Sequence, residues 1–402
     1  MNEIFKKILA YGGIELLNKS IPFILLPILT RYLTPSEYGT VTTYQLTWQL
    51  LSIVLSFGFT SLLTVGYHKN NYDDFINLKN QIFSTSFYLG IMIFIILCIS
   101  IYSFKLNIVY IYILLSALLL SLVNYCLAIN QTQKKIANYA IIQLILTASN
   151  MSFSVILVIY LSLGIDGRLI GFLLSPFFAL AACFFIKNVS SSALKLKFFN
   201  FSLLKNGTPL LIHQIINWSR YSIDKYMILF LLGNYSLGIY NINFQLAFSL
   251  SILVLVVNRV IQPILFEQLK NNKSTIKIFL LQIAIAVFGL IFIYLLIYFF
   301  GVFIIGSKFT IENNIFITLL VSFFIQGIYL SLCNYLYYYQ LNKQIMSNSL
   351  LSLLSASAIP FTMIYFFGFV GAAYGTLFST AVLTIFTYFT LHKNKILPWD
   401  RK

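Results

Sequence analysis

Residues 208–232 form a stretch that is long and apolar enough to cross a bilayer, at about 20 residues per span, and that carries four polar side chains at helical spacing. They are His213, Asn217, Arg220 and Asp224, at spacings i, i+4, i+7 and i+11. On one helix of 3.6 residues per turn they lie within about 60° of one another and form a polar stripe. Arg220 and Asp224 are four residues apart, which predicts an ion pair.

A charged side chain near the middle of the hydrocarbon layer costs at least about 2.5–3.5 kcal/mol, so it normally faces a water-filled cavity or a partner. Two interpretations of the stripe follow. The Arg220–Asp224 pair either only holds two helices together, or belongs to a transport cavity with a cation at its centre. The second is the working hypothesis, because intramembrane ionisable residues mark substrate or ion paths.

The first apolar run of the chain repeats this pattern. Tyr11, Glu15, Asn18 and Pro22 follow the same spacing, and Lys19 lies four residues after Glu15. Lys19 and Arg220 are 201 residues apart, each near the middle of its run. Two separate structural ion pairs would give the same pattern, but equivalent positions favour one shared cavity. Lys19, Arg220 and Lys225 are then its cations, and Glu15 and Asp224 compensate their charge.

In each half of the chain, the apolar run that follows the one just described carries amides and hydroxyls on one face. These are Thr42, Gln45, Gln49, Ser52 and Ser56 in one run, and Asn241, Gln245 and Ser249 in the other. Such groups suit the hydroxyls of a sugar, and they serve equally well as hydrogen bonds between helices. Together with Asn18, His213 and Asn217, the amides Gln45, Gln49, Asn241 and Gln245 are the candidate cavity lining.

The composition indicates the elements that position these residues. Of 402 residues, 59% are hydrophobic and 9% are charged, far below the quarter typical of soluble proteins. The apolar runs are continuous and about twice the length of a β-barrel strand, so the sequence predicts an all-α polytopic membrane protein. The net charge of +16 sits mostly in loops, which favours orientation in an anionic membrane and not nucleic-acid binding. The four cysteines fall inside apolar runs and are expected to be packing residues.

We expect about twelve spans. They cover residues 8–30, 40–66, 80–102, 108–129, 139–162, 168–187, 208–232, 236–261, 277–300, 313–338, 348–367 and 369–391. Nineteen of the 26 lysines and arginines then lie on the side of both termini, four lie on the other (Arg31, Lys105, Arg168 and Lys308), and three lie within spans. This bias predicts that both termini are cytoplasmic.

An internal repeat divides the chain near its middle. Gly39 matches Gly238, Lys134-Lys135-Ile136 matches Lys343-Gln344-Ile345, and Gly167, Gly171 and Ser175 match Gly371, Gly375 and Ser379, at offsets of 199, 209 and 204. Chance similarity between apolar runs is the alternative. The repeat predicts two pseudo-symmetric six-helix bundles, residues 1–187 and 207–402, joined by a basic cytoplasmic linker, residues 188–206. Parallel repeats of this kind suit alternating access.

Motifs of soluble chemistry are missing. The stretch Gly301 to Lys308 resembles a phosphate-binding loop, but it ends in Ser-Lys where Lys-Ser or Lys-Thr is needed. His68, His213 and His392 are scattered, and no metal-ligand or Ser/His/Asp pattern appears. We expect no enzyme activity and no cofactor. Work would come from a coupling ion, the membrane potential or the substrate gradient.

Residues 21–39, Ile-Pro-Phe-Ile-Leu-Leu-Pro-Ile-Leu-Thr-Arg-Tyr-Leu-Thr-Pro-Ser-Glu-Tyr-Gly, resemble the N-terminal signature of the polysaccharide transporter family. Ser222-Ile-Asp-Lys-Tyr-Met-Ile-Leu with Leu-Gly-Ile-Tyr at 237–240, and Val370-Gly-Ala-Ala-Tyr-Gly, are similar to two later segments of that family. The family includes flippases for O-antigen and capsule units. The resemblance extends over essentially the whole chain.

This resemblance implies a V-shaped multidrug/oligosaccharidyl-lipid/polysaccharide exporter fold in the bacterial inner membrane. The implied substrate is an undecaprenyl-diphosphate-linked oligosaccharide, moved from the cytoplasmic to the periplasmic leaflet, with a glycan polymerase and a chain-length regulator as partners. Lys19, Arg220 and Lys225 would then hold the diphosphate. One cation per half at the matching positions makes this cavity less basic than in the peptidoglycan-precursor branch.

Three other functions compete with this one. A cation-coupled drug antiporter of the same superfamily suits a pocket dominated by carboxylates, whereas cations predominate here. A glycan polymerase or ligase typically has a long periplasmic loop, and the expected outer loops are short. A structural scaffold leaves polar stripes at midplane without a purpose.

Overall fold

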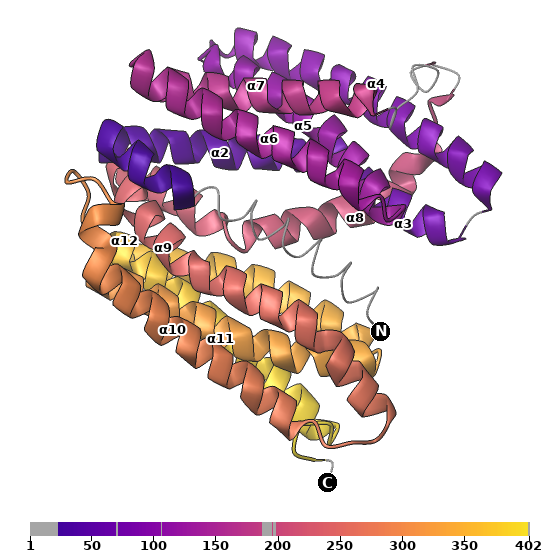
Figure 1. Ribbon diagram of the computed structural model, residues 1–402, viewed down its shortest axis with the longest axis vertical. Helices are drawn as coiled ribbons and strands as arrows, with labels where there is room; N and C mark the ends of the chain where they lie inside the picture. The colour runs from indigo at the N-terminus through magenta and orange to yellow at the C-terminus, as the bar shows by residue number, and fades with distance from the viewer. Residues whose placement is uncertain (1–22, 70, 106, 187–194, 196–197, 401–402) are drawn as a thin grey trace. The chain divides into compact units, whose positions relative to one another are not determined.

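The computed structural model describes residues 23–69, 71–105, 107–186, 195 and 198–400. A helical segment, Phe23–Tyr32, precedes the labelled helices in Figure 1. Those of the N-terminal part are α2 (Pro35–Ser56), α3 (Phe59–Lys69), α4 (Tyr72–Ser103), α5 (Val109–Thr132), α6 (Ile136–Val155) with a π-helical turn (Ile156–Tyr160), and α7 (Gly164–Phe185). Those of the C-terminal part are α8 (Ser202–Ser219), α9 (Ile223–Lys270), α10 (Ile276–Ile304), α11 (Asn313–Tyr338) and α12 (Asn342–Lys393).

The described chain is that of an all-α polytopic membrane protein, which confirms the predicted fold class. Within the described residues, eight helices are long and apolar enough to cross a membrane, or nine if α2 and α3, which meet at a 48° bend, form one span. Two of the eight cover two expected spans each, because α9 is broken at Gly233 and α12 at Gly368. The Phe23–Tyr32 segment belongs to the first expected span, and α8 shares the span expected at 208–232 with the part of α9 before Gly233.

Contacts divide the molecule into two compact units. Unit 1 contains Val41–Trp218, and unit 2 contains Pro22–Thr40 and Ser219–Lys402, apart from the residues that are not described. The sequence boundaries place α8 in the C-terminal bundle, whereas its contacts lie in unit 1. The Nε2 of Gln214 on α8 donates to the hydroxyls of Thr60 and Ser61 on α3, at 3.4 and 3.3 Å.

The start of α2 follows from local sequence. Thr34 and Glu37 form a capping box: the Thr34 backbone N–H donates to Glu37 Oε2 at 2.7 Å, and the Glu37 N–H donates to Thr34 Oγ1 at 3.4 Å. Pro35 occupies the first helical position, where its missing N–H costs nothing. The segment that resembles a family signature is therefore a helix start.

The repeated Gly-x3-Gly-x3-Ser segments pack alike within each unit. A Cβ on Gly171 would lie 2.7 Å from Ser154 Oγ of α6, and a Cβ on Gly375 would lie 2.4 Å from Pro360 Cα in the first part of α12. Ser175 and Ser379 also bond the facing segment in each case, Ser175 to Asn150 and Ser379 to the Ser355 carbonyl. Small residues at this spacing let two helices approach closely, which supports the repeat.

A second repeated pair is in mutual contact. A Cβ on Gly39 would lie 1.9 Å from the Asn234 carbonyl oxygen, and a Cβ on Gly238 would lie 2.0 Å from the Pro35 carbonyl oxygen. Each glycine therefore touches the residue four positions before the other. Such reciprocity is typical of equivalent segments that meet at a two-fold relation. Only glycine fits at either position.

The third repeated match is displaced. Lys134 and Gln340 both have positive φ, 58° and 53°, after α5 and α11. The next residue in each case bonds back five positions, Lys135 to Asn130 O at 2.8 Å and Leu341 to Leu336 O at 3.0 Å. Lys134 thus corresponds to Gln340, three residues from the position that the sequence match assigns. The shared helix ending fixes the alignment better than the lysines do.

Candidate functional site

The opening stretch is not one helix. Helix α8 ends at Ser219, residues 220–222 form a turn, and α9 begins at Ile223. The expectation of a single polar stripe is therefore wrong, because a break resets the angular relation between residues on its two sides. His213 and Asn217 remain on α8, exposed and bonded to each other at 3.0 Å, in unit 1.

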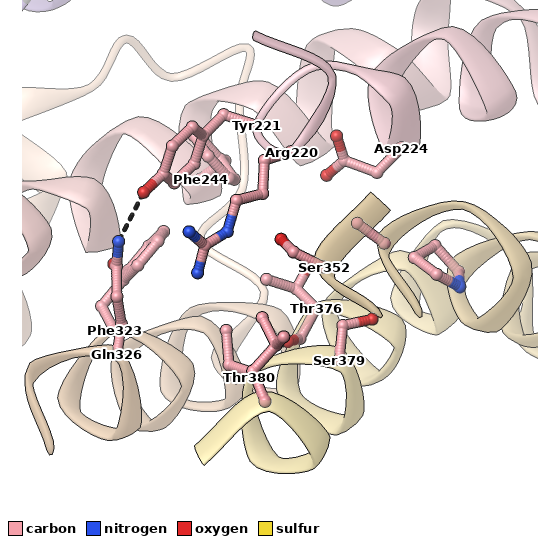
Figure 2. A pocket seen from close by; sticks show the side chains of 13 residues that line it. Arg220, Tyr221, Asp224, Phe244, Phe323, Gln326, Ser352, Thr376, Ser379 and Thr380 are labelled. Atoms are coloured by element: carbon pink, nitrogen blue, oxygen red, sulfur yellow. Dashed lines mark hydrogen bonds between the residues drawn. The ribbon is translucent and has the colours of Figure 1, made fainter. Parts of the chain in front are cut away.

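Arg220 lies in that break and points into a pocket of unit 2. Its guanidinium enters the space between α11 and α12 (Figure 2). The guanidinium carbon is 5.1 Å from the ring centroid of Tyr329 and 6.0 Å from that of Tyr221. These rings give cation–π contacts, which stabilise the charge without neutralising it.

The pocket has a volume of about 30 Å³, room for about two water molecules. Its lining residues come from the turn before α9 and from α9, α11 and α12. They are Arg220, Tyr221, Asp224, Phe244, Phe323, Gln326, Ser352, Ala356, Pro360, Thr376, Ser379, Thr380 and Leu383.

Asp224 is engaged by groups other than Arg220. Its Oδ1 lies 3.5 Å from Lys225 Nζ, and its Oδ2 accepts a 2.6 Å hydrogen bond from the Tyr240 hydroxyl. All three side chains are buried. The expected Arg220–Asp224 pair is thus replaced, among the described residues, by an Asp224–Lys225 pair.

Lys225 has several partners among the described residues besides Asp224. Its ammonium donates to the Tyr221 carbonyl at 2.6 Å and lies 3.3 Å from the ring centroid of Phe244. The Tyr221 carbonyl is available because the helix is broken there. The family resemblance implies that Lys225 binds a diphosphate, but this geometry makes it a partner of Asp224 and of the freed backbone.

Most polar groups of the pocket wall are also engaged. Gln326 donates to the Tyr221 hydroxyl and accepts from Ser251 at 2.9 Å. The Ser379 hydroxyl donates to the Ser355 carbonyl at 2.8 Å. Ser352 differs: its Oγ is buried and has no hydrogen-bond partner among the described residues. Arg220 and Ser352 are therefore the candidate groups for a polar ligand here.

The remaining expected site residues lie outside this pocket. Gln45 and Gln49 are half-buried on the unit 1 part of α2, Asn241 is buried on α9, and Gln245 accepts from the Tyr38 hydroxyl at 3.1 Å. The expected residues Glu15, Asn18 and Lys19 lie outside the described residues.

Several pocket residues were not predicted. Gln326, Ser352, Thr376 and Thr380 lie on α11 and α12, far along the chain from Arg220. The repeated Gly-x3-Gly-x3-Ser segment contains Thr376 and Ser379 and is followed directly by Thr380, so it was the signal available. The charge count places Arg168 in an outer loop, but it is buried in α7, where it donates to Asn150 at 2.8 Å and to Ser154.

Metal-binding clusters are another possible site chemistry. Within the described ranges, no group of three or more His, Cys, Asp or Glu side chains could hold a metal ion. The pocket is instead a small space with a mainly apolar lining, into which a guanidinium and a hydroxyl are presented.

Several solved structures share this fold. An inward-facing multidrug resistance MATE family transporter of the MOP superfamily aligns with a TM-score of 0.73 at 11% identity, covering 94% of this chain and 96% of that one. The MATE multidrug transporter DinF-BH aligns with a TM-score of 0.66 at 14% identity, covering 98% and 97%. At such low identity these likenesses establish the fold alone, which this chain shares with the two transporters.

Sequence comparisons give the family. Residues 4–269 match the family described as polysaccharide biosynthesis protein, and the chain belongs to that family. The Lsg locus putative protein 1 of Haemophilus influenzae is 30% identical, over 98% of this chain and 100% of that protein. An uncharacterized membrane protein of the same organism is 27% identical, over 92% and 89%.

Proposed function

We propose that the protein is a flippase that moves an undecaprenyl-diphosphate-linked oligosaccharide from the cytoplasmic to the periplasmic leaflet of the inner membrane. Family membership supports a role in polysaccharide biosynthesis, and the fold supports transport by alternating access. The observation that carries the proposal is Arg220, a cation directed into a pocket whose carboxylate is already paired with Lys225.

The diphosphate and sugars cannot cross hydrocarbon unaided, whereas the polyprenyl chain can remain in lipid. Arg220 would bind phosphate oxygens in a charge-assisted, bidentate fork. Ser352 would donate a further hydrogen bond. The pocket, at about 30 Å³, is small beside a sugar, so we place a phosphate oxygen here and the glycan elsewhere. Lys19, Gln45, Gln49, Asn241 and Gln245 remain our proposed contacts for the rest of the head group.

The competing drug antiporter would use a carboxylate to bind a coupling cation or a cationic drug. Asp224 is the carboxylate that lines this pocket, and Lys225 and Tyr240 already hold it. The pocket therefore suits an anionic ligand better than a cationic one, which favours the glycan lipid as substrate.

The experiment is complementation of a strain that lacks the gene, with surface glycan and lipid-linked repeat units measured together. Loss of a charge-assisted hydrogen bond costs about 1.5–3 kcal/mol, so R220Q should lower flipping by about 10-fold or more. R220K keeps the charge but loses the fork, and should retain partial activity. Repeat units should accumulate in the cytoplasmic leaflet.

Lys277 is exposed, and K277M provides a control for loss of a positive charge outside the pocket. It should complement fully. Normal surface glycan with R220Q, at normal protein level, would contradict the proposed role of Arg220. Drug susceptibility that depends on the gene, with unchanged glycan, would favour the antiporter instead.

A further inference from the structure

We propose that Lys225 is a positioning residue: its ammonium holds the Asp224 carboxylate so that this carboxylate does not neutralise Arg220. This inference rests on the proposed function, because it concerns the readiness of Arg220 to bind an anion. It assigns to Lys225 a role as an internal counter-ion, in place of direct contact with the substrate.

The first step is the geometry around the ammonium. Lys225 Nζ is held by the Tyr221 carbonyl at 2.6 Å, by Asp224 Oδ1 at 3.5 Å and by the face of Phe244 at 3.3 Å from its centroid. The Lys225 residue is 3% exposed. An ammonium in this position has no open side for a diphosphate, so direct substrate binding by Lys225 would require it to leave three contacts.

The second step is the competition for Asp224. This carboxylate and the Arg220 guanidinium line the same pocket, and they lie only four positions apart in the chain. A buried carboxylate without a partner is strongly unfavourable, so it takes an available cation. If the Lys225 ammonium were removed, Arg220 would be the cation left beside Asp224 among the described residues that line the pocket. Arg220 would then be paired internally and compete poorly for phosphate.

The third step is the second oxygen of Asp224. The Tyr240 hydroxyl donates to Oδ2 at 2.6 Å, while the Lys225 backbone N–H donates to Oδ1 at 2.9 Å. The carboxylate is thus fixed at both oxygens on the side of α9. These bonds orient it, and the ammonium supplies the compensating charge.

The test measures binding of inorganic pyrophosphate to the purified full chain in detergent, by isothermal titration calorimetry. The variants are R220Q, K225M and the double variant D224N/K225M, with K277M as the matched lysine control. We expect R220Q and K225M each to weaken binding by about 10-fold or more, since one charge-assisted contact is lost in both. The double variant should recover to within about threefold of the wild-type Kd, because no carboxylate remains to capture Arg220.

A second readout separates positioning from simple loss of structure. Phenylglyoxal labelling of Arg220, quantified by peptide mass spectrometry on the monodisperse fraction, should slow in K225M and recover in D224N/K225M. A purely structural ion pair would change thermal stability but leave this labelling rate unchanged in folded protein. If K225M does not fold, the double variant, which has no buried charge at either position, must still bind pyrophosphate.

Failure of this inference and failure of the proposed function give different results. Unaltered binding in R220Q would show that Arg220 is not the anion-binding group, and the proposed site would fall. Weakened binding in R220Q together with unaltered binding in K225M would overturn only the role of Lys225. A double variant as weak as K225M would also overturn that role.

Discussion

Asp224 has two positively charged neighbours in the sequence, Arg220 and Lys225. Helical spacing favours a pair with Arg220, but the structure pairs Asp224 with Lys225. Adjacent residues on a helix point about 100° apart, so Lys225 would not normally meet Asp224. The long lysine side chain instead folds back toward the broken backbone at Tyr221, which places its ammonium 3.5 Å from the Asp224 carboxylate. Arg220 is left facing the pocket. One broken turn thus decides which cation is compensated.

Ser352 presents a second single side chain of the pocket that can be tested. Its hydroxyl is buried and lacks a partner in the described part of the chain, so S352A should leave the free energy of unfolding unchanged or raise it by up to about 1 kcal/mol. If the hydroxyl donates to a phosphate oxygen, flipping should fall by about 5- to 10-fold. Thermal unfolding and the complementation assay measure the two effects.

Ser355 is the matched control for this substitution. It lies one turn further along α12, and its hydroxyl already donates to the Ser352 carbonyl at 3.3 Å. S355A should cost a little stability and spare transport. Equal loss of transport in S352A and S355A would show that the effect comes from helix packing and not from the pocket.

At the scale of the elements, helix breaks matter more than helix lengths. Gly233 and Gly368 have positive φ, 82° and 62°, and each separates two spans that otherwise read as one long helix. Residues 220–222 break the chain again between α8 and α9. Backbone groups freed inside a membrane need partners, so such breaks persist where protein supplies them, as Lys225 does for Tyr221.

Helices α2 and α9 approach each other closely at Gly39 and Gly238. G238V should destabilise the protein by several kcal/mol, because the new Cβ would lie 2.0 Å from the Pro35 carbonyl and helix backbone cannot yield cheaply. We expect low protein levels and a lower thermal midpoint in detergent. G39V should behave alike, since its Cβ would lie 1.9 Å from the Asn234 carbonyl.

Gly289 on α10 provides the comparison. A Cβ there would meet only the ends of Leu250 and Leu253, at 3.2 Å, and flexible leucine side chains can shift. G289A should be tolerated. A G238V protein as stable as G289A would contradict the close approach of α2 and α9.

At the scale of the whole molecule, the distribution of lysines predicts an orientation in the membrane. Lys270, Lys273 and Lys277 predict a cytoplasmic loop between α9 and α10, and Lys308 predicts an outer loop after α10. Green fluorescent protein fused after Lys402 should fluoresce, and alkaline phosphatase should be active after Lys308 and inactive after Lys273. The reverse pattern would contradict the proposed topology and with it the direction of transport.

Sequence alone determined that this is a helical membrane protein with an internal repeat, and it identified Arg220 as the residue of interest. Those conclusions depend on hydrophobic length and on small residues at fixed spacing, which are local properties. The family resemblance was also readable in the sequence of residues 21–39, and within that segment Thr34 and Glu37 form a capping box that the local sequence specifies by itself.

The tertiary structure alone decided which groups meet. The predicted Arg220–Asp224 pair assumed an unbroken helix, and four-residue spacing has no meaning across a break. Gln326 reaches the pocket from α11 and Ser352 from α12, both more than 100 residues further along the chain than Arg220. Nothing in their local sequence distinguishes them from other buried polar residues. Pairing inside a membrane protein is set by competition among all buried partners, and that competition exists only after the helices have packed.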